Sequence, residues 1–248
     1  MSEKSRVQFM VVGAQKCGTS SICSILEKHS EINFSSPKET HFFTKHIEWH
    51  SRLGDYDKFF AANRTGMRGE GSTSYTLHAT LTERIAEHIF QYNPAMKIIY
   101  VIRNPLDRFV SHYMHMYQRG RTSMGLTEAY RNYNQLVEAG KYATQIDPYI
   151  KRFGRQQVHI ALFDSFVNSP EFFLFKICNF LNIDPDKILP CTDVHLNRSV
   201  GQNTTPYHYD RFLNSTSGKM LRQIVPAQLG RRILRTISRN QNLSLIHI

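Results

Sequence analysis

Runs of apolar residues alternate with amphipathic stretches along most of the chain. Uninterrupted apolar runs predict buried strands at Val7–Gly13, Lys97–Arg103 and Val158–Phe163. Apolar residues spaced three or four apart predict the helices Ser20–His29, His78–Tyr92, Leu106–Tyr117, Thr127–Ala139, Gln145–Phe153, Pro170–Leu181 and Val225–Ser238. The alternation of strands and helices favours an α/β fold with a central, mostly parallel sheet.

Composition is that of a globular protein, with 41% hydrophobic and 21% charged residues. The net charge of +11 is unevenly placed, because no acidic residue follows Asp210. The basic residues after that point are Arg211, Lys219, Arg222, Arg231, Arg232, Arg235 and Arg239. This basic end is either a solvated helix face or a surface that attracts an anionic ligand, acceptor or membrane.

No apolar run approaches the ~18 residues that a bilayer span requires. The short polar start before Val7 leaves no room for a secretory signal, so we expect a cytoplasmic protein. The four cysteines have neither a CxxC pair nor metal-ligand spacing, and we expect all of them to be reduced: Cys17, Cys23, Cys178 and Cys191.

The strongest chemical signal is the segment GAQKCGTSS, Gly13–Ser21, between a predicted strand and a predicted helix. Backbone N–H groups in such a turn, together with the helix N-terminus, form a cradle for an anion. In the nucleotide-triphosphatase loop, a lysine follows the second glycine. Here Thr19 holds that place and the lysine is Lys16, inside the loop.

A loop of this form after the first strand resembles the 5′-phosphosulfate loop of PAPS-dependent sulfotransferases (PAPS is 3′-phosphoadenosine 5′-phosphosulfate). It is most similar to the heparan-sulfate-type and related bacterial members of that family. The resemblance implies a P-loop-like three-layer sandwich. It also implies that the lysine of the loop, Lys16, stabilises the departing PAP. The residues that it assigns to the donor are Lys16, Cys17, Gly18, Thr19 and Ser20.

A second match is YVIRNPLDRFVSHY, Tyr100–Tyr113. The family holds the 3′-phosphate with an arginine and a serine eight residues apart, which implies this role for Arg103 and Ser111. The positively charged guanidinium of an arginine can donate two parallel hydrogen bonds to a phosphate, and a hydroxyl adds another donor. We expect Arg108 to be structural.

A third match is SPKETHFF, Ser36–Phe43, in which the family's general base corresponds to Glu39. A carboxylate suits proton abstraction from the acceptor when it lies in a partly desolvated cleft. His41 is the second candidate for the base, although we expect it to be a structural partner. The two phenylalanines that follow it are expected in the core or the cleft wall.

Two further segments match the family less closely. In GEGSTSY, Gly69–Tyr75, the family's lysine is replaced by Gly71, and we expect Glu70 to be structural. In HLNRSVGQN, His195–Asn203, the resemblance places Arg198 and Gly201 near the nucleotide's phosphates.

The sequence therefore predicts transfer of a sulfuryl group from PAPS to an acceptor hydroxyl or amine, with a glycan, a lipid-linked sugar and a small metabolite all open as acceptors. Lys16 and Glu39 are the predicted catalytic residues, and no metal is expected. One alternative is a P-loop nucleotide kinase, which the misplaced lysine disfavours. Another is a non-catalytic polyanion-binding protein. We expect no nucleic-acid partner, since aromatic and basic residues are not interleaved.

The chain is predicted to be a single sulfotransferase domain over residues 1–242. The last six residues, Leu243–Ile248, are what the end of a common transposon-based sequencing adaptor encodes. We expect residues 243–248 to come from that adaptor and the domain to be truncated at its C-terminus.

Overall fold

A computed structural model describes residues 6–188 of the chain. The predictions for Cys191, Arg198, Gly201, Val225–Ser238 and residues 243–248 lie outside this range. The described residues form two compact units, which we treat separately. One consists of residues 6–103 and 141–188, and the other of residues 104–140.

The larger unit is built on a five-stranded sheet of order β2-β3-β1-β4-β5. All of its strand pairs are parallel. The strands are β1 (Phe9–Gly13), β2 (Ile32–Phe34), β3 (Met67–Glu70), β4 (Lys97–Ile102) and β5 (Val158–Leu162). Because the strands are parallel, all of them end at one edge of the sheet, where ligands bind in open α/β folds.

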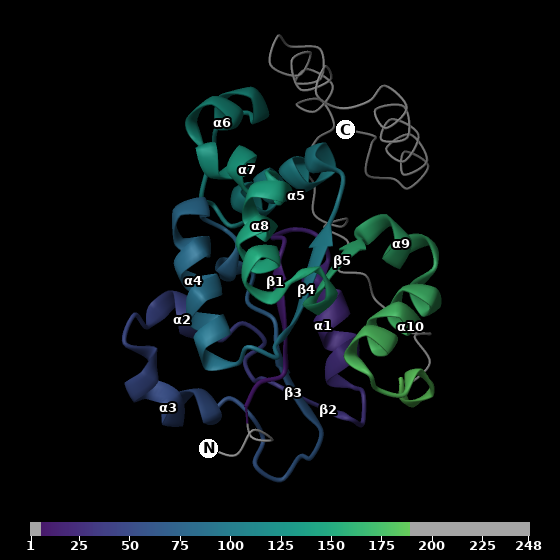
Figure 1. Ribbon diagram of the computed structural model, residues 1–248. Coiled ribbons are helices and arrows are strands. Elements are labelled where there is room, and N and C mark those ends of the chain that lie inside the picture. The colour runs from purple at the N-terminus through teal and green to yellow at the C-terminus, as the bar shows by residue number, and fades with distance from the viewer. Residues whose placement is uncertain (1–5, 189–248) are drawn as a thin grey trace. The chain divides into compact units, whose positions relative to one another are not determined.

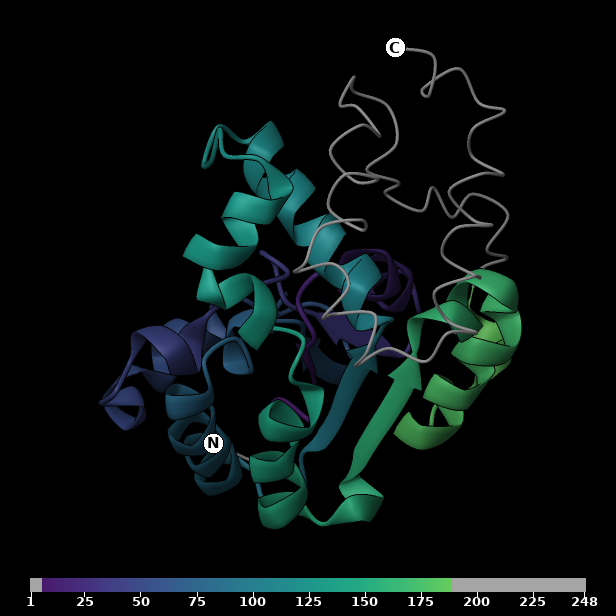
Figure 2. The same ribbon diagram turned by 90° about the horizontal axis from the view of Figure 1, so that it is seen from above.

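Helices cover both faces of this sheet. Figures 1 and 2 show α1 and α10 on one face and α4 and α8 on the other. The helices of this unit are α1 (Thr19–Glu27), α2 (Phe42–Lys45), α3 (Leu53–Asp57), α4 (Ala79–Tyr92), α8 (Tyr142–Phe153), α9 (Phe163–Asn168) and α10 (Pro170–Leu181). The predicted three-layer α/β architecture is thus confirmed for this unit.

The central strands are apolar because both of their faces are covered. Every residue of β1 is buried, and so are Ile98, Ile99, Tyr100 and Val101 of β4. The predicted strand at Val158–Phe163 ends one residue earlier, since Phe163 begins α9.

The smaller unit consists of α5 (Pro105–Gln118), α6 (Leu126–Asn132) and α7 (Asn134–Glu138). The Asn104 side chain caps α5 by accepting hydrogen bonds from the N–H groups of Leu106 and Asp107. The prediction of one helix over Thr127–Ala139 was wrong, because the backbone at Tyr133 has φ −113° and ψ 81° and divides α6 from α7. These helices bury a small apolar cluster of their own.

Within the part of the chain that the structure describes, no helix has the length and hydropathy needed to cross a membrane. The longest described helices, α4 and α5, have 14 residues each.

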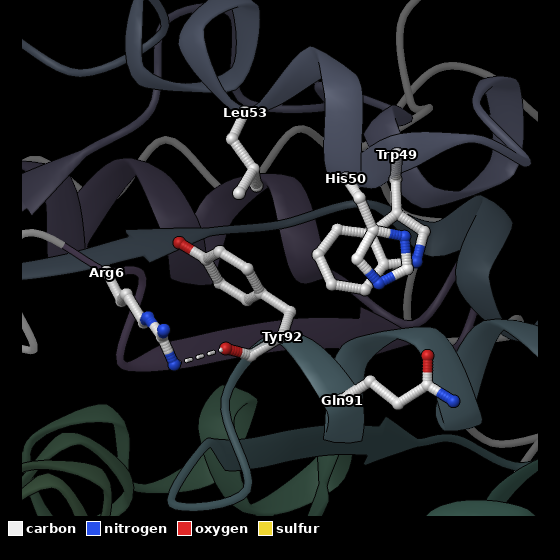
Figure 3. Close-up of a pocket in the computed structure, with 6 residues that line it drawn as sticks. All are labelled: Arg6, Trp49, His50, Leu53, Gln91 and Tyr92. Atoms are coloured by element: carbon white, nitrogen blue, oxygen red, sulfur yellow. Dashed lines mark hydrogen bonds between the residues drawn. The ribbon is translucent and has the colours of Figure 1, made fainter. Parts of the chain in front are cut away.

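A pocket of about 230 Å³ lies at the amino-terminal side of β1, away from the edge where the strands end. Its lining residues are Arg6, Trp49, His50, Leu53, Gln91 and Tyr92 (Figure 3). Arg6 Nη1 donates to the Tyr92 carbonyl at 2.9 Å and so joins the start of the chain to the end of α4. No predicted site residue lines this pocket.

Candidate active site

The predicted phosphate loop lies at the end of β1 and leads directly into α1. Lys16 and Gly18 have positive φ angles of 68° and 78°, which turn the backbone sharply before the helix. Gly18 is the N-cap of α1 and provides no side-chain cap. The first helical N–H groups, beginning at Thr19, therefore lack a side-chain acceptor and can bind an anion.

Gly18 is required by its surroundings as well as by its φ angle. A Cβ atom at this position would lie 2.2 Å from Cε2 of Phe163. Phe163 also contacts Arg103, whose guanidinium carbon lies 4.8 Å from the ring centroid. The ring of Phe163 thus packs between the phosphate loop and the arginine predicted to hold the 3′-phosphate.

Tyr142, at the start of α8, makes a second connection between these two regions. Its hydroxyl donates to the Arg103 carbonyl at 2.8 Å and lies 3.6 Å from Cys17 Sγ. Cys17 is buried in the loop, so Tyr142 fixes the loop backbone relative to the end of β4.

The predicted base, Glu39, lies in a polar group at the same edge of the sheet. Its side chain is 30% exposed. Lys38 Nζ lies 3.0 Å from Glu39 Oε1, and Thr73 Oγ1 donates to Oε2 at 3.3 Å. The Lys38 ammonium also donates to Thr19 Oγ1 at 3.4 Å, which brings Glu39 to the first residue of α1. The structure therefore brings together the predicted base and the N-terminus of the loop's helix.

His41 is also near the predicted base, but other groups hold it. Its Nδ1 is 2.8 Å from Ser74 Oγ, and its backbone N–H donates to Ser72 Oγ at 3.1 Å. His41 Nε2 lies 3.7 Å from Glu39 Oε2. This geometry fits the predicted role of His41 as a structural partner.

Glu70, at the end of β3, is completely buried and accepts hydrogen bonds from four hydroxyl groups. Thr40 and Ser72 donate to Oε2 at 2.6 and 2.8 Å, and Tyr56 and Tyr75 donate to Oε1 at 2.5 and 2.9 Å. Burial raises the pKa of Glu70 above its ordinary value, and the four hydroxyl groups oppose this shift. Glu70 thus fixes the position of Thr40, the residue after Glu39.

Cys17, Cys23 and Cys178 are free and buried. Burial raises the pKa of Cys23 to about 12 and that of Cys178 to about 11. Both remain protonated at neutral pH, so neither is a nucleophile.

Three residues discussed in the sequence analysis, Ser20, Ser111 and Arg108, lie on the helices α1 and α5. Ser20 is exposed on α1, next to Thr19. Ser111 is half-buried on α5 in the smaller unit, so its pairing with Arg103 stays a prediction. Arg108 of the same helix is completely buried, bonds the Leu136 carbonyl and lies 3.2 Å from His112 Nδ1, which fits a structural role.

Sequence reasoning missed three residues that position this site: Lys38, Tyr142 and Phe163. Phe163 is the last residue of a predicted strand, and this position at the sheet edge was a usable signal. Lys38 is adjacent to Glu39 in the sequence, whereas Tyr142 had no local signal. Within residues 6–188, no cluster of three or more His, Cys, Asp or Glu side chains is arranged to hold a metal ion.

Comparison with known proteins agrees with this geometry. A family model described as "Sulfotransferase domain" matches residues 6–219. Mouse heparan sulfate glucosamine 3-O-sulfotransferase 5 is 24% identical over 197 residues, which cover 71% of this chain and 53% of that protein. The human bifunctional heparan sulfate N-deacetylase/N-sulfotransferase 2 is 27% identical over 199 residues, which cover 72% of this chain and 22% of that protein. The chain thus spans about half the length of the mouse relative, and less of the human one.

The crystal structure of a sulfotransferase from Alicyclobacillus acidocaldarius is similar over most of both chains. The TM-score is 0.68 at 27% identity, and the match covers 84% of this chain and 90% of that one. Together with the family match over most of the sequence, this likeness confirms the resemblance inferred from the phosphate loop: the chain belongs to the sulfotransferase domain family, whose members transfer sulfuryl groups.

Proposed function

We propose that this protein transfers the sulfuryl group of PAPS to a hydroxyl or amine of an acceptor and releases PAP. The observation that carries the proposal is the meeting of a phosphate loop and a half-buried carboxylate at one edge of the sheet. Lys38 links the two, through Thr19 on one side and Glu39 on the other. The family match supports the reaction, and Arg103 beside the loop supports a donor with a second phosphate.

The proposed reaction is an in-line displacement at sulfur, similar to phosphoryl transfer. Glu39 takes the acceptor proton as the acceptor oxygen or nitrogen forms its bond to sulfur. The bond between sulfur and the bridging oxygen breaks, and its electron pair stays on the 5′-phosphate of PAP. Lys16 and the N–H groups of the loop stabilise the charge that develops there, a contribution of about 10²–10³ in rate for one preorganised donor.

The acceptor class remains a proposal. The heparan sulfate relatives suggest a glycan, but Gly71 replaces a lysine that the family resemblance expects. The buried free thiols favour a reducing compartment, so the cytoplasm stays the proposed location. A mass-spectrometric assay with PAPS and a panel of sugar, lipid-linked and small-molecule acceptors would identify the substrate.

The donor can be tested by nucleotide-dependent thermal stability. We expect PAP to raise the melting temperature clearly more than AMP or ATP in buffer without magnesium, because at equal concentration the ligand that binds more tightly stabilises the folded state more. An equal shift with ATP, or a strict need for magnesium, would favour a P-loop kinase. Salt-sensitive binding of polyanions with no nucleotide effect would favour the non-catalytic alternative.

Arg103→Ala should weaken PAP binding by about 1.5–3 kcal/mol, the worth of a hydrogen bond to a charged group. Isothermal calorimetry with PAP measures this effect directly. Arg52→Ala is the matched control, because the Arg52 side chain is 52% exposed and forms an ion pair with Asp55 three residues away. Equal PAP affinity in the wild type and Arg103→Ala would remove Arg103 from the donor site.

A further inference from the structure

The position of Lys38 is set by groups on both sides of the proposed reaction centre. Its Nζ lies 3.0 Å from Glu39 Oε1 and 3.4 Å from Thr19 Oγ1. Its side chain is 24% exposed, so the ammonium lies in the site rather than extending into solvent. The cation therefore occupies the space between the proposed base and the loop that receives the donor.

The main chain at Gly71 makes room for this arrangement. A Cβ atom at position 71 would lie 3.0 Å from Cε of Lys38 and 2.6 Å from Sγ of Cys23. A larger residue at position 71 would displace either the Lys38 stem or the thiol. Because Cys23 has a pKa raised to about 12 by burial, it remains neutral and does not compete for the ammonium.

We propose that Lys38 binds the sulfuryl oxygens of the donor and stabilises them during transfer. This inference rests on the proposed function. In an in-line displacement, sulfur lies between the acceptor atom, whose proton goes to Glu39, and the bridging oxygen at the loop. Lys38 lies between those same two places. A compact ammonium with three donors can bind a sulfuryl oxygen and keep its bond to Glu39.

Lys16 and Lys38 stabilise different sides of the bond that breaks, which joins sulfur to the bridging oxygen. Lys16 serves the bridging oxygen and the phosphate, which remain in PAP. Lys38 serves the sulfuryl oxygens, which leave with the acceptor. Loss of Lys38 should therefore affect PAPS, which carries the sulfuryl group, more than PAP, which lacks it.

The test compares the affinities of PAPS and PAP by calorimetry without an acceptor. In Lys38→Met, we expect the ratio Kd(PAPS)/Kd(PAP) to rise on the order of 10-fold or more, while PAP affinity changes by less than about 3-fold. Lys38→Arg should keep the ratio near that of the wild type. Hydrolysis of PAPS to PAP and sulfate, with water as the acceptor, should slow at least about 10-fold in Lys38→Met.

Lys58→Met is the matched control, because the Lys58 side chain is 77% exposed and pairs with Asp55. An unchanged ratio in Lys38→Met would overturn the inference, and an equal loss of both ligands would reassign Lys38 to a phosphate. If the wild type binds neither PAPS nor PAP, the proposed function itself fails. Melting temperatures of Lys38→Met and Lys38→Arg within a few degrees of the wild type establish that a changed ratio does not come from misfolding.

Discussion

Glu39→Gln should lower sulfuryl transfer by about 10²–10⁴ while leaving PAP affinity within a few-fold of the wild type. The amide is nearly isosteric and keeps an oxygen for Lys38 and Thr73, so the site should retain its shape. It cannot take the acceptor proton. The measurement is PAP release with PAPS and the best acceptor of the panel, together with calorimetry for PAP.

Glu48→Gln is the control for this substitution, because Glu48 is an exposed glutamate a short distance after Glu39 in the sequence. Turnover close to that of the wild type in Glu39→Gln would show that another group is the base. His41 would be the next candidate, because its Nε2 lies 3.7 Å from Glu39 Oε2. In that case His41→Asn should lower turnover by a similar factor and Glu39→Gln should not.

The central strands were predictable from sequence because burial on both faces demands apolar residues throughout β1 and β4. The edge strand β2 and its neighbour β3 were not. β2 has only three residues, Ile32–Phe34, too few for a pattern. β3 reads Met-Arg-Gly-Glu, and its last residue is an acidic side chain at a buried position. Glu70 is tolerated there only because hydroxyl groups from three separate segments surround it, which no local pattern reveals.

The candidate site was predictable to the extent that it depends on short segments. The phosphate loop and Arg103 lie at the ends of the predicted strands β1 and β4, and parallel strands bring their carboxyl ends to one edge. Glu39 follows the unpredicted strand β2, so the family resemblance alone indicated it. Contacts between those segments were not predictable. Tyr142 reaches Arg103 and Cys17 from α8, and the Lys38 stem passes Gly71. Such contacts depend on packing rather than on neighbouring residues in the sequence.

Glu70→Leu should destabilise the protein by at least about 3 kcal/mol, because each buried hydroxyl left without an acceptor costs about 1–3 kcal/mol. Some of this cost is recovered, since Thr40 Oγ1 and Tyr75 OH are already 3.3 Å apart and can bond each other. The loss is a large part of the ~5–15 kcal/mol stability of a domain. It should lower the melting temperature by roughly 6–12 °C or more. A variant with wild-type stability would contradict the anchoring role of Glu70.

Glu70→Gln tests the effect of ionisation more directly, because it removes the titratable group and keeps nearly the same side-chain shape. The pKa of Glu70 in the folded protein is raised by burial, so over a range of pH the folded state holds a proton that the unfolded state has lost. Across that range, which begins near the ordinary carboxyl pKa, Glu70 makes the free energy of unfolding fall as pH rises. Glu70→Gln lacks this contribution and retains a hydrogen-bond acceptor for the hydroxyl groups.

The stability of Glu70→Gln relative to the wild type should therefore improve as pH rises above about 4, near the ordinary glutamate pKa. Urea unfolding of both proteins at several pH values measures the difference, in which titrations shared by both proteins largely cancel. Glu48→Gln, at an exposed position, should run parallel to the wild type. If Glu70→Gln also ran parallel, the pKa of Glu70 would be the same in the folded and unfolded states. If it lost stability as pH rose, the hydroxyl groups of Thr40, Tyr56, Ser72 and Tyr75 would outweigh burial and hold the carboxylate ionised.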